Sequence, residues 1–233
     1  MSFLRSASPL RPPRHDLYLG IHKGIRAFMC ETLRRVGSMD SDDDAELAET
    51  LAGVSLLLDF CRAHLEHENA VIHPALEAVR RGAAQPASQD HAEHETSLSI
   101  IAAQVNLIGE SRGCTRARAA LRLYRLLAIF IGENFLHMHM EETDHNDALW
   151  FAYTDAELVA LEHRIHAMIP PAEMALALRW MIPAMTPAER LEVIGPLAEA
   201  LPPAVFEALL HDLRPHLDAR ALAKLERGLR RAA

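Results

Sequence analysis

Seven histidine and glutamate side chains, spread over four separate stretches of the chain, have the types and spacing of metal ligands. They are His22, His64, Glu68, His91, His94, His137 and Glu141. Imidazole and carboxylate groups are the donors that proteins use for iron, zinc and manganese ions. Of the 14 histidines, 10 precede residue 150, so the metal-binding chemistry belongs to that part of the chain.

The stretch around residue 91 shows how these donors relate to a helix. His91 and His94 are followed by Leu98 and Ile101, and this spacing of three or four residues continues to residue 108. Such a spacing predicts a helix with one apolar face. Both histidines lie on that face, so we expect them to point into a protein core.

The other three stretches follow the same rule. His22 lies on the apolar stripe of its predicted helix, and His64 and His137 lie on theirs. Glu68 and Glu141 each follow a histidine by four residues, a step that rotates only about 40° around a helix. Each pair therefore projects two donors in the same direction. Four inward stripes that all carry donors predict one shared metal site, and facing helices are a usual way to build one.

The positions of glycine, proline and acidic residues predict the elements that carry these donors. The chain is rich in alanine and leucine and shows no alternation typical of strands, which predicts an all-α protein. Long helices are expected over residues 15–36, 45–81, 89–110 and 116–150, with Pro74 kinking or splitting the second. Residues 1–14 are expected to form an extended arm. Residues 154–233 are expected to form a C-terminal extension of shorter helices.

Composition excludes several functions. The formal net charge of −8 argues against nucleic acid as a partner, because phosphate binding needs a basic face. No apolar run reaches the ~20 residues of a membrane-spanning helix, and the first residues do not resemble a signal peptide. Cys30, Cys61 and Cys114 are isolated, so no disulfide framework is expected and all three are interpreted as small buried side chains. These features favour a cytoplasmic protein.

Four segments together resemble the hemerythrin-like, or HHE cation-binding, family over residues 15–150. They are IHKGIRAF around His22, HLEHENAVIHPAL from His64, DHAEHETSL around His91 and HMHMEETDH from His137. The resemblance implies an antiparallel four-helix bundle that holds two iron ions, bridged by carboxylates and an oxo or hydroxo group. It also implies that zinc or manganese can replace iron on purification.

Two details of the ligand set stay open in the sequence. Hemerythrin proper separates its third-helix pair by four residues, whereas His91 and His94 are three apart, so either histidine, or Glu95, is a candidate. Hemerythrin proper also places its last carboxylate five residues after the last histidine, which would select Glu142, while the helical phase favours Glu141. His67, His73, His139 and His145 lie off the stripe or past a break and are interpreted as solvated or as supporting the ligands from outside.

The resemblance implies a protein that binds O2 or a related small oxidant for sensing, storage or carriage. Two alternatives are a di-iron oxidoreductase acting on peroxide or nitric oxide, and a helical interaction module with a structural metal. We favour binding over catalysis, because the sequence contains no dedicated acid, base or electron-partner motif. Residues 154–233 carry apolar stripes and no cluster of donors, so we expect them to pack on the bundle, on a second copy or on a protein partner. An apolar pocket is expected from Ile25, Leu98, Ile101, Leu127 and Phe130.

Overall fold

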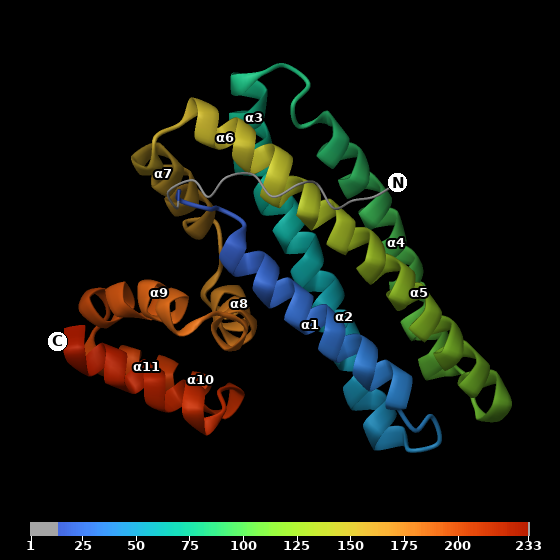
Figure 1. Cartoon of the computed structure of the whole chain (residues 1–233). Helices are drawn as coiled ribbons and strands as arrows, with labels where there is room; N and C mark the ends of the chain where they lie inside the picture. Colours follow the sequence, from blue (N-terminus) through green and yellow to red (C-terminus); the bar gives the residue numbers. More distant parts are fainter. Residues whose placement is uncertain (1–13, 233) are drawn as a thin grey trace.

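The computed structural model describes residues 14–232, and these residues form helices and no strand (Figure 1). The predicted arm, residues 1–14, lies outside the described part except for Arg14. The elements are α1 (Leu19–Ser38), α2 (Asp44–His67), η1 (Glu68–Ile72), α3 (His73–Val79), α4 (Gln85–Glu110), α5 (Gly113–Met140), η2 (Glu141–His145), α6 (Asn146–Ala152), α7 (Asp155–His166), α8 (Pro171–Ala184), α9 (Pro187–Ala200), α10 (Pro203–Leu213), η3 (Arg214–His216) and α11 (Ala219–Ala232).

The four long helices lie beside one another (Figure 1). Helix α1 contacts α2, α2 contacts α4, α4 contacts α5, and α5 returns to α1. Their apolar stripes meet in one core, in which the five residues expected to form an apolar pocket are all buried. These are Ile25, Leu98, Ile101, Leu127 and Phe130. The all-α prediction is therefore confirmed for the described residues, and the core supplies the rigid frame that the donors need.

Helix α1 begins at Leu19, later than the expected His15. The reason is local, because the Asp16 carboxylate accepts hydrogen bonds from the backbone N–H groups of Tyr18 and Leu19 at 2.9 and 3.1 Å. An acidic side chain at this position satisfies N–H groups that have no partner within a helix. Asp43 does the same for α2, where it accepts from Ala45 and Glu46.

The second and fourth predicted helices are each interrupted. A π-helical turn, in which a backbone N–H bonds to the carbonyl five residues earlier, covers Glu68–Ile72 and again Glu141–His145. Pro74, which has no N–H, follows the first turn directly. A π turn inserts one extra residue, so side chains beyond it are rotated relative to a continuous α-helix. Residues 113–152 are helical throughout, so the helix expected over residues 116–150 is confirmed, with a π turn inside it.

Among the C-terminal helices, α8 makes the contact with α1 (Figure 1). Trp180 stacks on Phe28 with ring centroids 4.2 Å apart. The approach is close, because a Cβ atom added at Gly24 would lie 2.8 Å from Cγ of Met181, and one at Gly20 would lie 2.8 Å from Cε of Met185. Thr154 and Thr186 cap the starts of α7 and α9, and each forms a capping box with the glutamate three residues later.

Helices α8 to α11 bury an apolar cluster of their own. Its buried members are Leu178, Ile182, Met185, Ile194, Leu213, Leu217 and Leu225. In the described part of the chain, no helix has the length and apolar content needed to cross a membrane. Cys61 is buried, but Cys30 and Cys114 are exposed, so the interpretation of all three as buried was wrong for two of them.

Candidate metal centre

Six of the predicted donors meet between the four long helices, near the start of α1 and α4 and the end of α2 and α5. One comes from each of α1, α2, α4 and α5, and two come from the π turns. They are His22, His64, His91 and His137, with Glu68 from η1 and Glu141 from η2. All are buried except His64, which is partly exposed. The apolar stripes therefore bring together donors that are more than a hundred residues apart in the chain.

The first group of donors comprises His22, His64 and Glu68, whose ligand atoms lie within 4.8 Å of one another. Oε1 of Glu68 is 3.2 Å from Nε2 of His64 and 3.7 Å from Nε2 of His22. The other carboxylate also reaches this group, because Oε2 of Glu141 is 3.5 Å from Nε2 of His22. Two imidazoles and two carboxylate oxygens thus face a common point.

The second group comprises Glu68, His91, His137 and Glu141. Oε2 of Glu68 is 3.4 Å from Nε2 of His91, and Oε1 of Glu141 is 3.3 Å from Nε2 of His137. Each carboxylate therefore turns one oxygen toward each histidine pair. A carboxylate in this position can bridge two metal ions, and the arrangement matches the oxygen and nitrogen ligands that iron, zinc and manganese accept.

The buried atoms of this cluster lack hydrogen-bond partners. Both oxygens of Glu68, both oxygens of Glu141 and Nε2 of His22 have none. The Nε2 atoms of His91 and His137 lie 3.0 Å apart. A histidine nitrogen that is free to bind metal carries no proton, so two such atoms cannot form a hydrogen bond with each other. Buried carboxylates without partners are costly, on the order of several kcal/mol each. A bound cation would satisfy all of these atoms, so the residues fit a metal centre.

The electrostatics agree with this chemistry. Burial lowers the pKa of His22, but the hydrogen bond to Glu142 and the nearby carboxylate of Glu68 outweigh it and raise the pKa to about 9. His91 also reaches about 9, because Glu141 and Glu68 outweigh its burial. Burial and the charge on Glu68 raise the pKa of Glu141, yet the nearby imidazoles of His137 and His91 bring it down to about 2. Without metal, protons on imidazole thus balance the buried carboxylates, and a metal ion would replace those protons.

Hydrogen-bond acceptors orient three of the histidines from behind. Nδ1 of His22 lies 3.0 Å from Glu142, which is also held by Arg26. Nδ1 of His91 lies 2.9 Å from Oδ1 of Asn69. Nδ1 of His137 lies 3.1 Å from Asp90. An acceptor on Nδ1 keeps the proton there and leaves the Nε2 lone pair for a metal, which is the usual arrangement around ligating histidines.

The alternatives left open by the sequence are placed as follows. Glu141 lies among the donors, whereas Glu142 stands behind His22. His91 belongs to the second group, whereas His94, also predicted as a ligand, lies outside both groups. The His94 ring is buried 5.0 Å from the ring of His137, and its Nδ1 atom has no partner. Glu95 points outward and pairs with Arg62 at 3.3 Å.

Three buried residues beside the donors were not predicted as ligands, and one of them, Tyr18, was not named by the sequence analysis at all. His73 and His145 were interpreted as solvated or as supporting residues, but both are buried, so the solvated interpretation was wrong. The His73 ring stacks on the His91 ring with centroids 4.8 Å apart. Tyr18 is 1% exposed and its hydroxyl lies 3.0 Å from Nδ1 of His145. His73 directly follows the first π turn and His145 ends the second, so the regular helical phase did not place either histidine.

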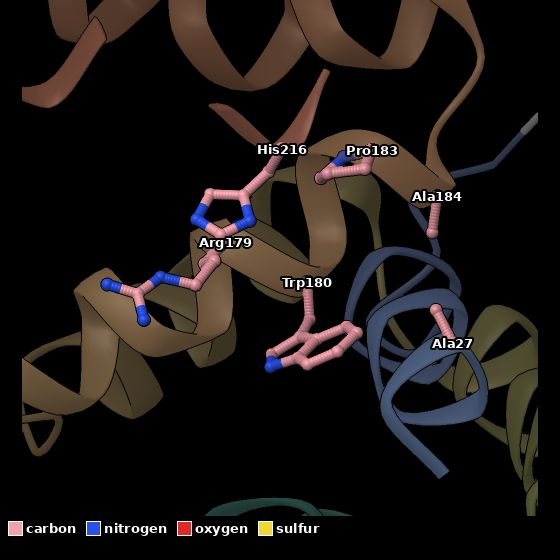
Figure 2. A pocket seen from close by; sticks show the side chains of 6 residues that line it. All are labelled: Ala27, Arg179, Trp180, Pro183, Ala184 and His216. Atoms are coloured by element: carbon pink, nitrogen blue, oxygen red, sulfur yellow. The ribbon is translucent and has the colours of Figure 1, made fainter. Parts of the chain in front are cut away.

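A hollow of about 250 Å³ lies elsewhere, between α1, α8 and η3 (Figure 2). Its walls are Ala27, Arg179, Trp180, Pro183, Ala184 and His216. None of these residues belongs to the buried donor groups, so the candidate chemistry lies in the core and not in this hollow. In comparisons with known proteins, no family model matches the chain, and no curated protein or solved structure matches it.

Proposed function

We propose that residues 15–150 form an antiparallel four-helix bundle of the hemerythrin-like type, which holds two iron ions and binds O2 or a related small oxidant. The ring of contacts among α1, α2, α4 and α5 supports the bundle. The short connections between α1 and α2, and between α4 and α5, support antiparallel neighbours.

The observation that carries the proposal is the sharing of carboxylates. Glu68 belongs to both donor groups, and each of its oxygens faces a different histidine pair. Glu141 repeats this arrangement with its own two oxygens. A mononuclear site needs no such sharing, because four donors already complete one tetrahedral ion. Two bridging carboxylates favour a pair of ions over a single one.

The metal pair would supply the O2-binding chemistry, and the chain controls its surroundings. Ile25, Leu98 and Phe130 are at most 2% exposed and lie in the apolar core, on the same helical stripes as the donors. Such a core excludes water, which strengthens electrostatic interactions inside the centre and limits proton access. This environment favours holding a small oxidant over its further reaction, and it supports a binding role over an enzymatic one.

The C-terminal helices suit a sensing role. Helix α8 packs against α1 at Gly24, two residues after His22. Lys23, next to His22, forms an ion pair with Glu189 of α9, with Nζ 2.7 Å from each carboxylate oxygen. A shift of α1 on ligand binding would therefore act directly on α8 and α9. A second copy or a protein partner would receive that change through the C-terminal helices.

Metal analysis with optical spectroscopy tests the proposal. Protein from iron-replete cells is expected to contain about two irons per chain, and its reduced form is expected to change spectrum on exposure to O2 and recover when O2 is removed. One ion or none after reconstitution would contradict the dinuclear centre. Rapid consumption of peroxide or nitric oxide by the loaded protein, without reversible O2 binding, would establish the oxidoreductase alternative instead.

A further inference from the structure

Large aliphatic side chains of α4 and α5 are exposed to solvent. Ile100 and Leu107 of α4, and Ile129 and Leu136 of α5, are each between 45% and 61% exposed. Helix α8 covers α1, whereas Figure 1 shows α4 and α5 on the side of the molecule away from α8 to α11. Isolated apolar side chains on a surface are ordinary, but a continuous patch of them marks an interface. Whether these four share one face decides between the two.

On α5 the two isoleucine and leucine side chains belong to one continuous exposed stripe. Its spacing of three or four residues keeps every member on one side of the helix. The members are Arg118, Arg122, Arg125, Ile129, Glu133 and Leu136, and all are exposed. A rise of 1.5 Å per residue makes the stripe about 27 Å long. The stripe lies on the flank of α5 turned toward α4, because the other flank carries Tyr124, whose ring lies against Gly37 of α1.

Helix α4 continues this face. Ile100, Ala103 and Leu107 are exposed at the same spacing of three or four residues. Gln104 lies on the α5 side of α4, because its Nε2 atom donates to the backbone carbonyl of Ala119 at 2.9 Å. Ile100 and Leu107 are four residues before and three residues after Gln104, so they lie on that same side. The two stripes therefore lie side by side on the outer surface of α4 and α5.

The charges on the α5 stripe are divided along its length. Arg118, Arg122 and Arg125 precede Ile129, and Glu133 follows it. None of these four charged side chains forms an ion pair with the residues that the structure describes. In a two-fold contact the same surface is used by both copies. An axis at Ile129 sets each residue opposite the one equally far on the other side of Ile129, so Glu133 faces Arg125 of the second copy.

We propose that the outer face of α4 and α5 is the interface with a second copy of this chain, in which the two α5 helices pack antiparallel about a two-fold axis at Ile129. Antiparallel packing buries Ile129 against its own copy and forms the Arg125–Glu133 pair twice. Parallel packing would instead place Arg125 against Arg125, and like charges oppose it. Leu136 falls opposite Arg122, whose aliphatic stem covers apolar surface. This interface is separate from the C-terminal helices, and it does not depend on a bound metal.

Analytical ultracentrifugation of the full chain tests the proposed interface. The mass of the wild-type protein is expected to rise with concentration toward twice the 25.9 kDa of one chain. Ile129→Asp is expected to weaken association by about 100-fold, because the two-fold axis brings two unpaired carboxylates together. Leu56→Asp, at an exposed leucine on α2, is the matched control and should associate as the wild type does. Circular dichroism should show the same helix content in all three proteins.

Charge reversal tests the direction of packing. Arg125→Glu and Glu133→Arg should each weaken association by about 10-fold, because each brings like charges together at two places in the interface. The double variant restores both ion pairs in the antiparallel arrangement, so its association should be within about threefold of the wild type. Parallel packing predicts no such recovery, since it sets each position of α5 against itself.

Three results would overturn the inference. The first is a wild-type chain that remains monomeric at every concentration. The second is a dimer that Ile129→Asp leaves intact, which would place the interface elsewhere, for example on the C-terminal helices. The third is hydroxyl-radical labelling of Leu136 that stays low in the dilute monomer, which would mean that another segment of the same chain covers this face.

Discussion

The four long helices and the C-terminal helices treat buried polar groups in opposite ways. In the C-terminal part, the buried guanidinium of Arg190 donates to the carbonyls of Ile182 and Pro183 at 2.7 and 2.9 Å. Among the long helices, the oxygens of Glu68 and Glu141 have no partner. Both regions are well packed, so poor folding does not explain the difference. The unsatisfied atoms mark the region that is built to hold something else.

Replacing Glu68 should have the largest effect on metal binding, because Glu68 is one of the buried carboxylates without a hydrogen-bond partner. Glu68→Gln keeps the shape of the side chain but removes the charge and one oxygen from a group that serves both histidine pairs. We expect loss of both metal ions, measured as metal per chain after reconstitution. Glu66→Gln, an exposed neighbour on α2, is the control and should keep full occupancy. Retention of two ions in Glu68→Gln would show that Glu68 is not shared.

The stability of the metal-free protein should fall on both sides of neutral pH. The pKa of His22, raised to about 9, contributes stability that is present below about 6.5 and is lost as the pH rises through 9. The pKa of Glu141, held at about 2, contributes stability that is present above about 4.5 and is lost as the pH falls toward 2. The pKa of His64, lowered to about 4, adds a loss between pH 6.5 and 4.

Denaturation with urea across this pH range measures the effect. Bound metal should remove the alkaline loss, since it replaces the protons that His22 and His91 carry in the metal-free protein. Identical alkaline profiles with and without metal would contradict the competition between protons and metal.

Changing a residue behind the donors should have a smaller effect. Glu142→Gln removes the charge that holds the Nδ1 proton of His22, and it disrupts the pair with Arg26. We expect metal affinity to fall about 10- to 100-fold without loss of stoichiometry at saturating metal. Competition with a chelator of known affinity gives the value. A complete loss of one ion would instead place Glu142 among the ligands.

The smallest effect is expected where the two regions meet. Gly24→Ala would place a Cβ atom 2.8 Å from Cγ and 3.1 Å from the backbone nitrogen of Met181. We expect the crowding to cost about 1–3 kcal/mol in the free energy of unfolding. Gly132→Ala is the control, because its Cβ meets nothing within 4 Å and should stabilise α5 by up to ~1 kcal/mol. Equal stabilities for the two variants would show that Met181 of α8 can move away from α1 at little cost in free energy.

Helical periodicity predicted the long helices and most of the donors, because the apolar stripe decides which side chains face the core. His22, His64, His91 and His137 all lie where their stripes place them. The same reasoning could not separate His91 from His94, since a step of three residues keeps both on one face. Their roles differ only through contacts from other helices, such as Asn69 with His91.

The sequence predicted an interruption at Pro74, which follows the first π turn, but no proline or glycine marks the second π turn. Each π turn begins at one of the two buried carboxylates, Glu68 or Glu141. His73 and His145 lie off the stripes of regular α-helices, so the sequence did not place them among the donors. Tyr18 precedes α1 and belongs to no stripe, so its contact with His145, 127 residues away, could emerge only in three dimensions.

The methionine side chains between α8 and α1 are sites where oxidants would damage the contact between the two helices. Met185 is 6% exposed and packs against Gly20, and Met181 packs against Gly24, on either side of His22 in the chain. Oxidation to the sulfoxide would make these apolar side chains polar within a closely packed contact. We expect it to detach α8 from α1, so that accumulated oxidative damage, and not only ligand exchange, would report on the exposure of the molecule.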